Sequence, residues 1–169
     1  ALARAGFGPV TKRKGKAYKA FCARCPNEMW QIDYVNLHGD YFLSVIDDHS
    51  RKILSADLRK TSTTDDVLEI LDTAIKTYGT PKIILSDHGT QWYAVRGGDS
   101  RFLAFCEERG INHIMAQIRK PTTIGKVERW HGTIRREADL PASRNIETKQ
   151  SVMEKFIEFY NKLRPHYAL

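Results

Sequence analysis

The 169-residue sequence has only three cysteines, too few and too unevenly spread for a disulfide framework. It also lacks a signal peptide, a membrane span and internal repeats. These absences argue against a secreted disulfide-rich protein and against a membrane protein, so we expect a cytoplasmic protein. Cys22 and Cys25 have zinc-ribbon spacing, but no second cysteine pair or histidine pair follows at a suitable distance, and we predict no metal there.

Acidic residues are missing from the first 24 positions, which contain seven lysines and arginines. Because the net charge is +7, the remainder has equal numbers of basic and acidic residues and is neutral. A basic, glycine-containing segment before a neutral body predicts a flexible arm that approaches a polyanion. The alternative is a solvated linker whose charge only aids solubility. We place this arm at residues 1–26 and one folded domain at residues 27–169, a length typical of a single domain.

The pattern of apolar residues predicts an α/β domain. Strand-like runs and helical periodicities alternate along the chain after residue 28. We expect strands at 29–37, 41–47, 53–58, 82–86 and 111–116, and helices from Thr63 or Thr64 to Gly79, at 101–109, near 124–138 and at 149–163. This order predicts a five-stranded mixed sheet, three antiparallel strands followed by two parallel ones, with helices on both faces.

Three carboxylates occur in distinctive contexts. Asp33 interrupts an apolar strand in WQIDYV, Asp87 follows the strand of IILSDHGTQW, and Glu128 opens a helix in GKVERWH. A carboxylate among apolar neighbours is costly unless it is hydrogen-bonded or binds a metal, and the carboxyl ends of parallel strands are usual ligand sites. The structural alternatives are a turn-forming Asp and a helix-capping Glu. If the three converge, oxygen-only ligands favour Mg²⁺ or Mn²⁺.

In type, order and context these acids resemble the catalytic Asp, Asp and Glu of the DDE transposase and retroviral integrase superfamily. The last ten residues, YNKLRPHYAL, also resemble the end of prokaryotic insertion-sequence transposase cores. The resemblance implies a ribonuclease H-like fold and a metal-dependent enzyme that cleaves DNA 3′ ends and joins them to target DNA. It further implies two Mg²⁺ ions, replaceable by Mn²⁺, with Asp33 bridging both and Asp87 and Glu128 each completing one.

The sequence departs from this family in a few places. His88 stands where many relatives have Asn, and the 40 residues between Asp87 and Glu128 exceed the usual spacing, with residues 95–100 as the expected extra loop. A helix-turn-helix and a His/Cys zinc domain are missing, so the chain resembles a catalytic core with its linker. Two alternatives stay open: a ribonuclease H-like nuclease that only hydrolyses, and a domesticated, non-catalytic DNA-binding module.

DNA is the expected partner, as transposon ends and as target duplex, and it should be held mainly through its phosphates. The resemblance also implies a homo-oligomer assembled on DNA in the prokaryotic, nucleoid-associated cytoplasm. His131 lies three residues after Glu128 on one helix face, where it could join the metal, contact a phosphate or pack beneath the site. The predicted DNA contacts are Arg119, Lys120, Lys126, Arg129, His131 and Arg135, and the alternative for these residues is a solvated charged helix.

Overall fold

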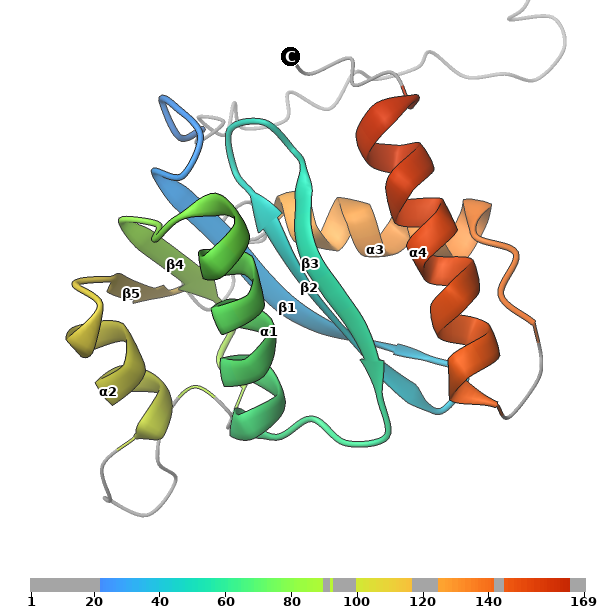
Figure 1. The fold of residues 1–169 in the computed structure, drawn as a ribbon, viewed down its shortest axis with the longest axis horizontal. Coiled ribbons are helices and arrows are strands. Elements are labelled where there is room, and N and C mark those ends of the chain that lie inside the picture. Colours follow the sequence, from blue (N-terminus) through green and yellow to red (C-terminus); the bar gives the residue numbers. More distant parts are fainter. Residues whose placement is uncertain (1–21, 90–91, 93–99, 117–124, 142–144, 165–169) are drawn as a thin grey trace, which may run out of the picture.

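The computed structural model describes residues 22–89, 92, 100–116, 125–141 and 145–164. Its centre is a five-stranded sheet in the order β3-β2-β1-β4-β5 (Figure 1). β1 and β2 pair antiparallel, as do β2 and β3, whereas β4 pairs parallel with both β1 and β5. This confirms the predicted mixed sheet. The strands are β1 (Met29–Leu37), β2 (Asp40–Asp47), β3 (Ile53–Arg59), β4 (Ile83–Ser86) and β5 (Asn112–Met115).

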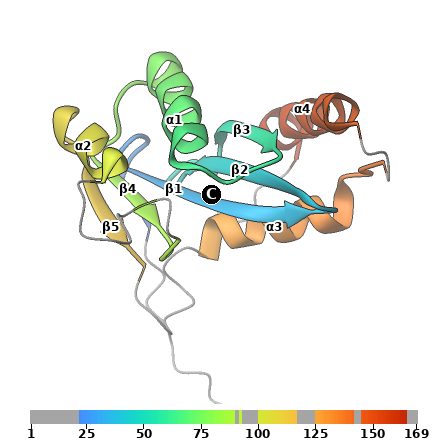
Figure 2. The same ribbon diagram turned by 90° about the horizontal axis from the view of Figure 1, so that it is seen from below.

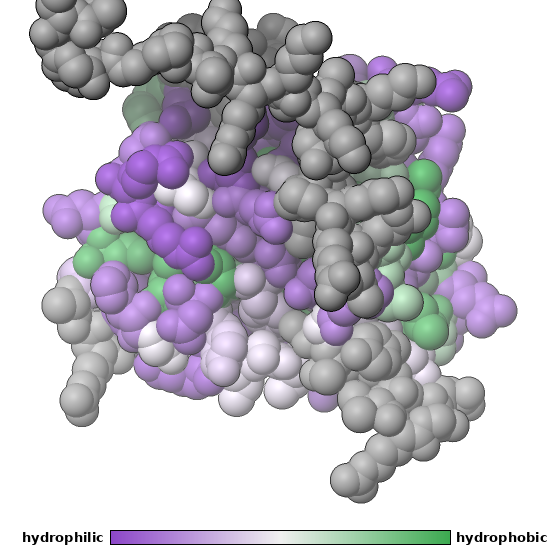
Figure 3. Space-filling model, turned by 180° about the vertical axis from the view of Figure 1, so that it is seen from behind, coloured by the Kyte–Doolittle hydropathy of each residue, from purple (hydrophilic) through white to green (hydrophobic). Residues whose placement is uncertain are grey.

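Helices lie on both faces of the sheet, as predicted. They are α1 (Thr64–Tyr78), α2 (Arg101–Glu108), α3 (Gly125–Glu137) and α4 (Ile146–Lys162). Seen along the sheet, α1 and α2 cover one face and α3 lies on the other, while α4 packs beside β3 (Figure 2). The face that carries α3 is mainly hydrophilic over its described surface (Figure 3).

Local signals explain where the helices begin. Thr63 caps α1 in a capping box: its side chain accepts from the Asp66 backbone N–H, and the Asp66 carboxylate accepts from the Thr63 N–H. α4 begins three residues earlier than the sequence predicted. The reason is Asn145, whose side-chain oxygen accepts from the backbone N–H groups of Glu147 and Thr148 at 2.8 and 3.2 Å.

Alternation along β1 divides the core into two clusters. Trp30 and Ile32 face α1 and α2, whereas Val35 and Leu37 face α3 and α4. Asp33 lies two residues before Val35 on the strand, so its side chain points to the same face, the α3 side of the sheet. The candidate site is therefore formed between the sheet and α3.

The described chain begins with a packed segment. Ala23 is buried, its N–H donates to the Asp48 carboxylate at 2.6 Å, and its carbonyl lies 2.9 Å from Nδ1 of His49. Residues 1–21 of the predicted arm and residues 95–99 of the extra loop predicted at 95–100 lie outside the described residues. Within the described parts, the helices are all too short or too polar to cross a bilayer.

Candidate active site

The parallel pairing of β1 with β4 brings Asp33 and Asp87 to neighbouring positions. The last paired residues are Gln31 and Leu85, and each Asp lies two residues beyond its own member of that pair. Neighbouring strands are about 4.8 Å apart, so the two acids meet where β4 ends and β1 continues. The carboxyl end of β4 thus supplies the second acid, as the sequence predicted.

The Asp87 carboxylate is oriented by the turn that follows β4. Its Oδ1 accepts from the Gly89 N–H at 2.9 Å and from the Trp92 indole N–H at 2.5 Å. Trp92 is fully buried, so the second bond connects the acid to the core. The turn-forming role considered for Asp87 is therefore present, and both bonds use the same carboxylate oxygen, which is compatible with a further role for the group.

Glu128 is positioned by the docking of α3 on the sheet. Val127, Trp130 and Ile134 are buried at helical spacing, and the Gln31 side-chain oxygen accepts from the Val127 backbone N–H at 3.2 Å. That bond satisfies one of the N–H groups that a helix start leaves unpaired. Glu128, in the first turn, is exposed on the neighbouring flank of the helix.

Electrostatics connects the three acids. Burial, and then the charges of Asp87 and Glu128, raise the pKa of Asp33 from 3.8 to about 7, against the opposing effects of the Tyr34 N–H and the Arg135 charge. Both other carboxylates are therefore close enough to repel the negative charge on Asp33. However, the described residues contain no group of three Asp, Glu, His or Cys side chains that is close enough together to hold a metal ion in this conformation.

The donor set nevertheless fits a hard divalent cation. Three carboxylates offer only oxygen ligands, and the repulsion that raises the pKa of Asp33 is the penalty that a bound cation removes. Asp33, Asp87 and Glu128 are the residues that would hold it.

His131 lies beneath Asp33 and away from solvent. It is 3 % exposed, its Nδ1 is 3.7 Å from Oδ2 of Asp33, and its Nε2 is 3.2 Å from the Ser44 hydroxyl. The Trp130 indole N–H donates to the same hydroxyl at 3.0 Å. Burial, and then the Arg135 charge, lower the pKa of His131 to about 3, which keeps the ring neutral. This burial favours the packing role over the predicted phosphate contact.

The predicted DNA contacts occupy different environments. Arg129 and Arg135 are exposed on α3, and Arg119 and Lys120 lie outside the described residues. Lys126 is paired with the carboxylate of Asp48 and is also bonded to the Asp48 carbonyl, with a side chain only 16 % exposed. A phosphate contact by Lys126 would therefore have to replace an existing ion pair.

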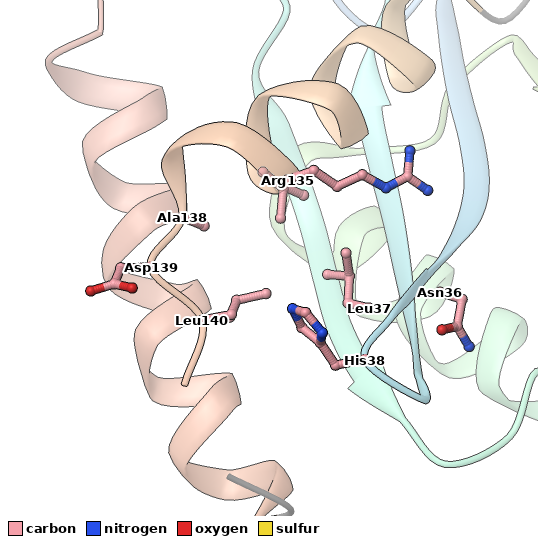
Figure 4. A pocket seen from close by; sticks show the side chains of 8 residues that line it. Asn36, Leu37, His38, Arg135, Ala138, Asp139 and Leu140 are labelled. Atoms are coloured by element: carbon pink, nitrogen blue, oxygen red, sulfur yellow. The ribbon is translucent and has the colours of Figure 1, made fainter. Parts of the chain in front are cut away.

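Arg135 borders a groove at the end of α3. The groove has a volume of about 430 Å³ and lies between the β1–β2 turn and the end of α3. Figure 4 shows the Arg135 side chain extending from α3 toward β1, with His38 and Leu140 around the hollow. None of the three acids lines the groove; the connection is the Arg135 charge, which lowers the pKa of Asp33.

The sequence reasoning missed Gln31, Ser44 and Asp48 as parts of the site. Each is a fully buried polar residue in or directly after β1 or β2, and each contacts α3. Gln31 could have been found, because it lies two residues before Asp33 on the same strand face. Asp48 directly follows β2, and nothing in its local sequence indicates a partner in α3.

The integrase core domain family matches residues 23–121 and, in a second match, residues 109–169. The chain belongs to the integrase core domain family. An insertion element IS476 protein of Xanthomonas euvesicatoria is 25 % identical over 158 residues, which cover 90 % of this chain but 44 % of that protein. The chain therefore spans less than half of this bacterial relative.

Retroviral proteins are also similar to this chain. A Gag-Pro-Pol polyprotein of human T-cell leukemia virus 3 is 32 % identical over 131 residues, covering 75 % of this chain and 9 % of the polyprotein. The magnesium complex of the HTLV-2 integrase catalytic core domain superposes with a TM-score of 0.67 at 20 % identity, over 86 % of this chain and 94 % of that one. This superposition confirms the ribonuclease H-like fold predicted from the sequence.

Proposed function

We propose that this chain is the catalytic core of a transposase or integrase that cleaves DNA to expose a 3′ hydroxyl and joins that hydroxyl to target DNA. One observation carries the proposal: burial and the charges of Asp87 and Glu128 together raise the pKa of Asp33. Three acids from β1, the end of β4 and the start of α3 thus act on one another at the position where the family resemblance expects the catalytic centre. Membership of the integrase core domain family supports the same reaction class.

Each residue has a defined task in this proposal. Asp33, Asp87 and Glu128 would hold two divalent cations, Mg²⁺ or Mn²⁺, which would supply activation of the attacking oxygen and stabilisation of the leaving oxygen. The Gly89 and Trp92 N–H groups orient Asp87, and the buried neutral ring of His131 lies under Asp33. Arg129 and Arg135 are exposed cations beside the site and would contact phosphates. Arg119 and Lys120 would do so from the preceding segment.

The test is a strand-transfer assay. Duplexes that carry pre-cleaved ends of the mobile element encoding this chain are mixed with a supercoiled plasmid in Mg²⁺ or Mn²⁺. We expect the ends to be joined to the plasmid, and Asp33→Asn, Asp87→Asn and Glu128→Gln to abolish joining. Glu108→Gln, which changes an exposed acid of α2, is the matched control and should retain activity.

The products distinguish the alternatives. Nicks without joining would identify a nuclease that only hydrolyses. If the protein tested binds the element ends and forms no product, it would be a non-catalytic DNA-binding module. Activity retained in folded Asp33→Asn or Asp87→Asn would contradict the assignment of the acids.

We further propose that the protein acts as a homo-oligomer on DNA, in the nucleoid-associated cytoplasm of a prokaryote. The HTLV-2 integrase catalytic core domain is described in a dimeric and in a trimeric form. Light scattering with and without end duplexes tests the assembly. The mass of the complex with DNA should correspond to more than one protomer per duplex. A mass of one protomer per duplex would contradict it.

A further inference from the structure

Asp48, the first residue after β2, is a fully buried carboxylate with three donors. Its Oδ1 accepts from the Gln31 side-chain amide at 2.7 Å, and its Oδ2 accepts from the Ala23 N–H at 2.6 Å and from the Lys126 ammonium. A buried charge requires such partners, because its desolvation is otherwise too costly. The three donors belong to the segment before β1, to β1 and to α3, so Asp48 connects these three parts of the chain.

Two of these contacts lead to the helix that carries Glu128. Lys126 is the second residue of α3, and its ammonium also donates to the Asp48 carbonyl at 3.0 Å. Gln31 donates to Asp48 through its amide nitrogen and accepts from the Val127 N–H through its oxygen. Of the two residues directly before Glu128, Lys126 thus bonds to Asp48 through its side chain, and Val127 is connected to Asp48 through Gln31.

We propose that Asp48 is a positioning residue that fixes the first turn of α3 and so sets the place of Glu128 relative to Asp33. This inference rests on the proposed function. Gln31 is the second member of the network, and it lies two residues from Asp33 on the same face of β1. One polar network therefore contacts the strand that carries the first acid and the helix turn that carries the third.

The other end of β2 provides a matched control. Asp40 is also buried and is bonded to two lysines, Lys149 at 2.7 Å and Lys60 at 2.5 Å. Its partners connect β2 to α4 and to the end of β3, and none of them belongs to the candidate site. Asp40→Asn and Asp48→Asn each remove one buried carboxylate charge that is paired with lysine. Only the Asp48 carboxylate contacts a residue of α3.

The first experiment is hydrogen–deuterium exchange on the metal-free full chain. Asp48→Asn leaves one acceptor oxygen, which can serve either the Gln31 amide or the pair formed by the Ala23 N–H and Lys126, and it removes the charge that faces Lys126. Amides 127–131 should therefore exchange at least about tenfold faster, which corresponds to about 1.4 kcal/mol. Asp40→Asn should leave those amides unchanged and loosen the start of α4. If Asp48→Asn does not fold, Lys126→Gln removes only the α3 end of the network and carries the same expectation. Equal protection of α3 in all variants would overturn the inference.

The second experiment measures Mn²⁺ affinity by electron paramagnetic resonance in a double-mutant cycle. Asp48→Asn should weaken Mn²⁺ binding by about tenfold, within the range seen when supports of metal ligands are removed. In the Glu128→Gln background the same change should have little effect, because the group that it positions is gone. Asp40→Asn should not change the affinity in either background. Equal weakening by Asp48→Asn in both backgrounds would show a merely structural role and overturn the inference.

The two readouts separate this inference from the function on which it rests. If wild-type protein and Glu128→Gln bound Mn²⁺ alike, the proposed metal role of Glu128 would be wrong, and the positioning inference would fall with it even if α3 were loosened. If the three acids bound Mn²⁺ and Asp48→Asn left both exchange and affinity unchanged, only the positioning inference would be wrong.

Discussion

Asp33 is the residue at which the electrostatics of the site can be tested by stability alone. An unfolded chain releases the Asp33 proton near pH 3.8, whereas the folded protein retains it to about pH 7. Between these values the folded state binds more protons, so this group makes stability fall as pH rises. Asp33→Asn cannot ionise and should be more stable than wild type at pH 8, by at most about 4 kcal/mol, with the difference vanishing near pH 4.

Urea denaturation at several pH values measures this difference. Asp40→Asn is the control of opposite sign: hydrogen bonds from Lys149 and Lys60 lower the pKa of Asp40, so its removal should destabilise the protein above pH 4. An Asp33→Asn protein that is less stable than wild type at pH 8 would show that the carboxylate is satisfied without a cation.

Divalent cations should relieve the same repulsion. Because a ligand that binds only the folded state stabilises it, Mg²⁺ at about 100 times its dissociation constant should add roughly 2.7 kcal/mol at pH 8. The gain should be lost in Asp33→Asn and in Asp87→Asn, and retained in Glu108→Gln. Differential scanning calorimetry with and without Mg²⁺ measures it, and an equal gain in all four proteins would place the cation elsewhere.

Single residues differ in how far the sequence could predict them. The three acids could be selected as candidates because each lies in a short distinctive run: Asp33 inside an apolar strand, Asp87 just after a strand and Glu128 at a helix start. The burial of His131 and the pairing of Lys126 could not, because their partners Ser44 and Asp48 are 87 and 78 residues away. Only the folded sheet brings those pairs together.

At the level of secondary-structure elements, helix α4 protects the edge of the sheet that β3 forms. Asn161 accepts from the Ile53 N–H and donates to the Ile53 carbonyl, both at 2.9 Å, and Gln150 accepts from the Leu58 N–H at 3.0 Å. These side chains form hydrogen bonds with backbone groups of β3 that could otherwise pair with another strand. Periodicity predicted both elements, but not the side-chain amides that join them.

Asn161→Ala tests this role. It leaves two backbone groups of Ile53 without their partner and should cost about 1 to 3 kcal/mol in the free energy of unfolding. Glu158→Ala, on the same helix, removes only an exposed pair with Lys162 that water and salt screen, so it should cost much less. Denaturant titration measures both, and equal costs would show that α4 does not protect the edge through Asn161.

For the whole molecule, charge asymmetry gives a further prediction. Deleting residues 1–21 removes six positive charges and no negative ones, and it leaves the packed Ala23 in place. The deletion should weaken binding to element-end and scrambled duplexes alike and flatten its dependence on salt. Fluorescence anisotropy at several salt concentrations tests this. An unchanged slope would make the arm a linker, and a selective loss on element ends would show that it reads sequence.

The most direct test of the central claim is anomalous diffraction from crystals of the protein grown with Mn²⁺. We predict a manganese peak at ligand distance, about 2.1 Å, from carboxylate oxygens of both Asp33 and Asp87, and a second peak at which Glu128 would complete the ligands. Absence of manganese from these carboxylates at saturating concentration, or peaks only at other residues, would contradict the assignment of this site as the metal-dependent catalytic centre.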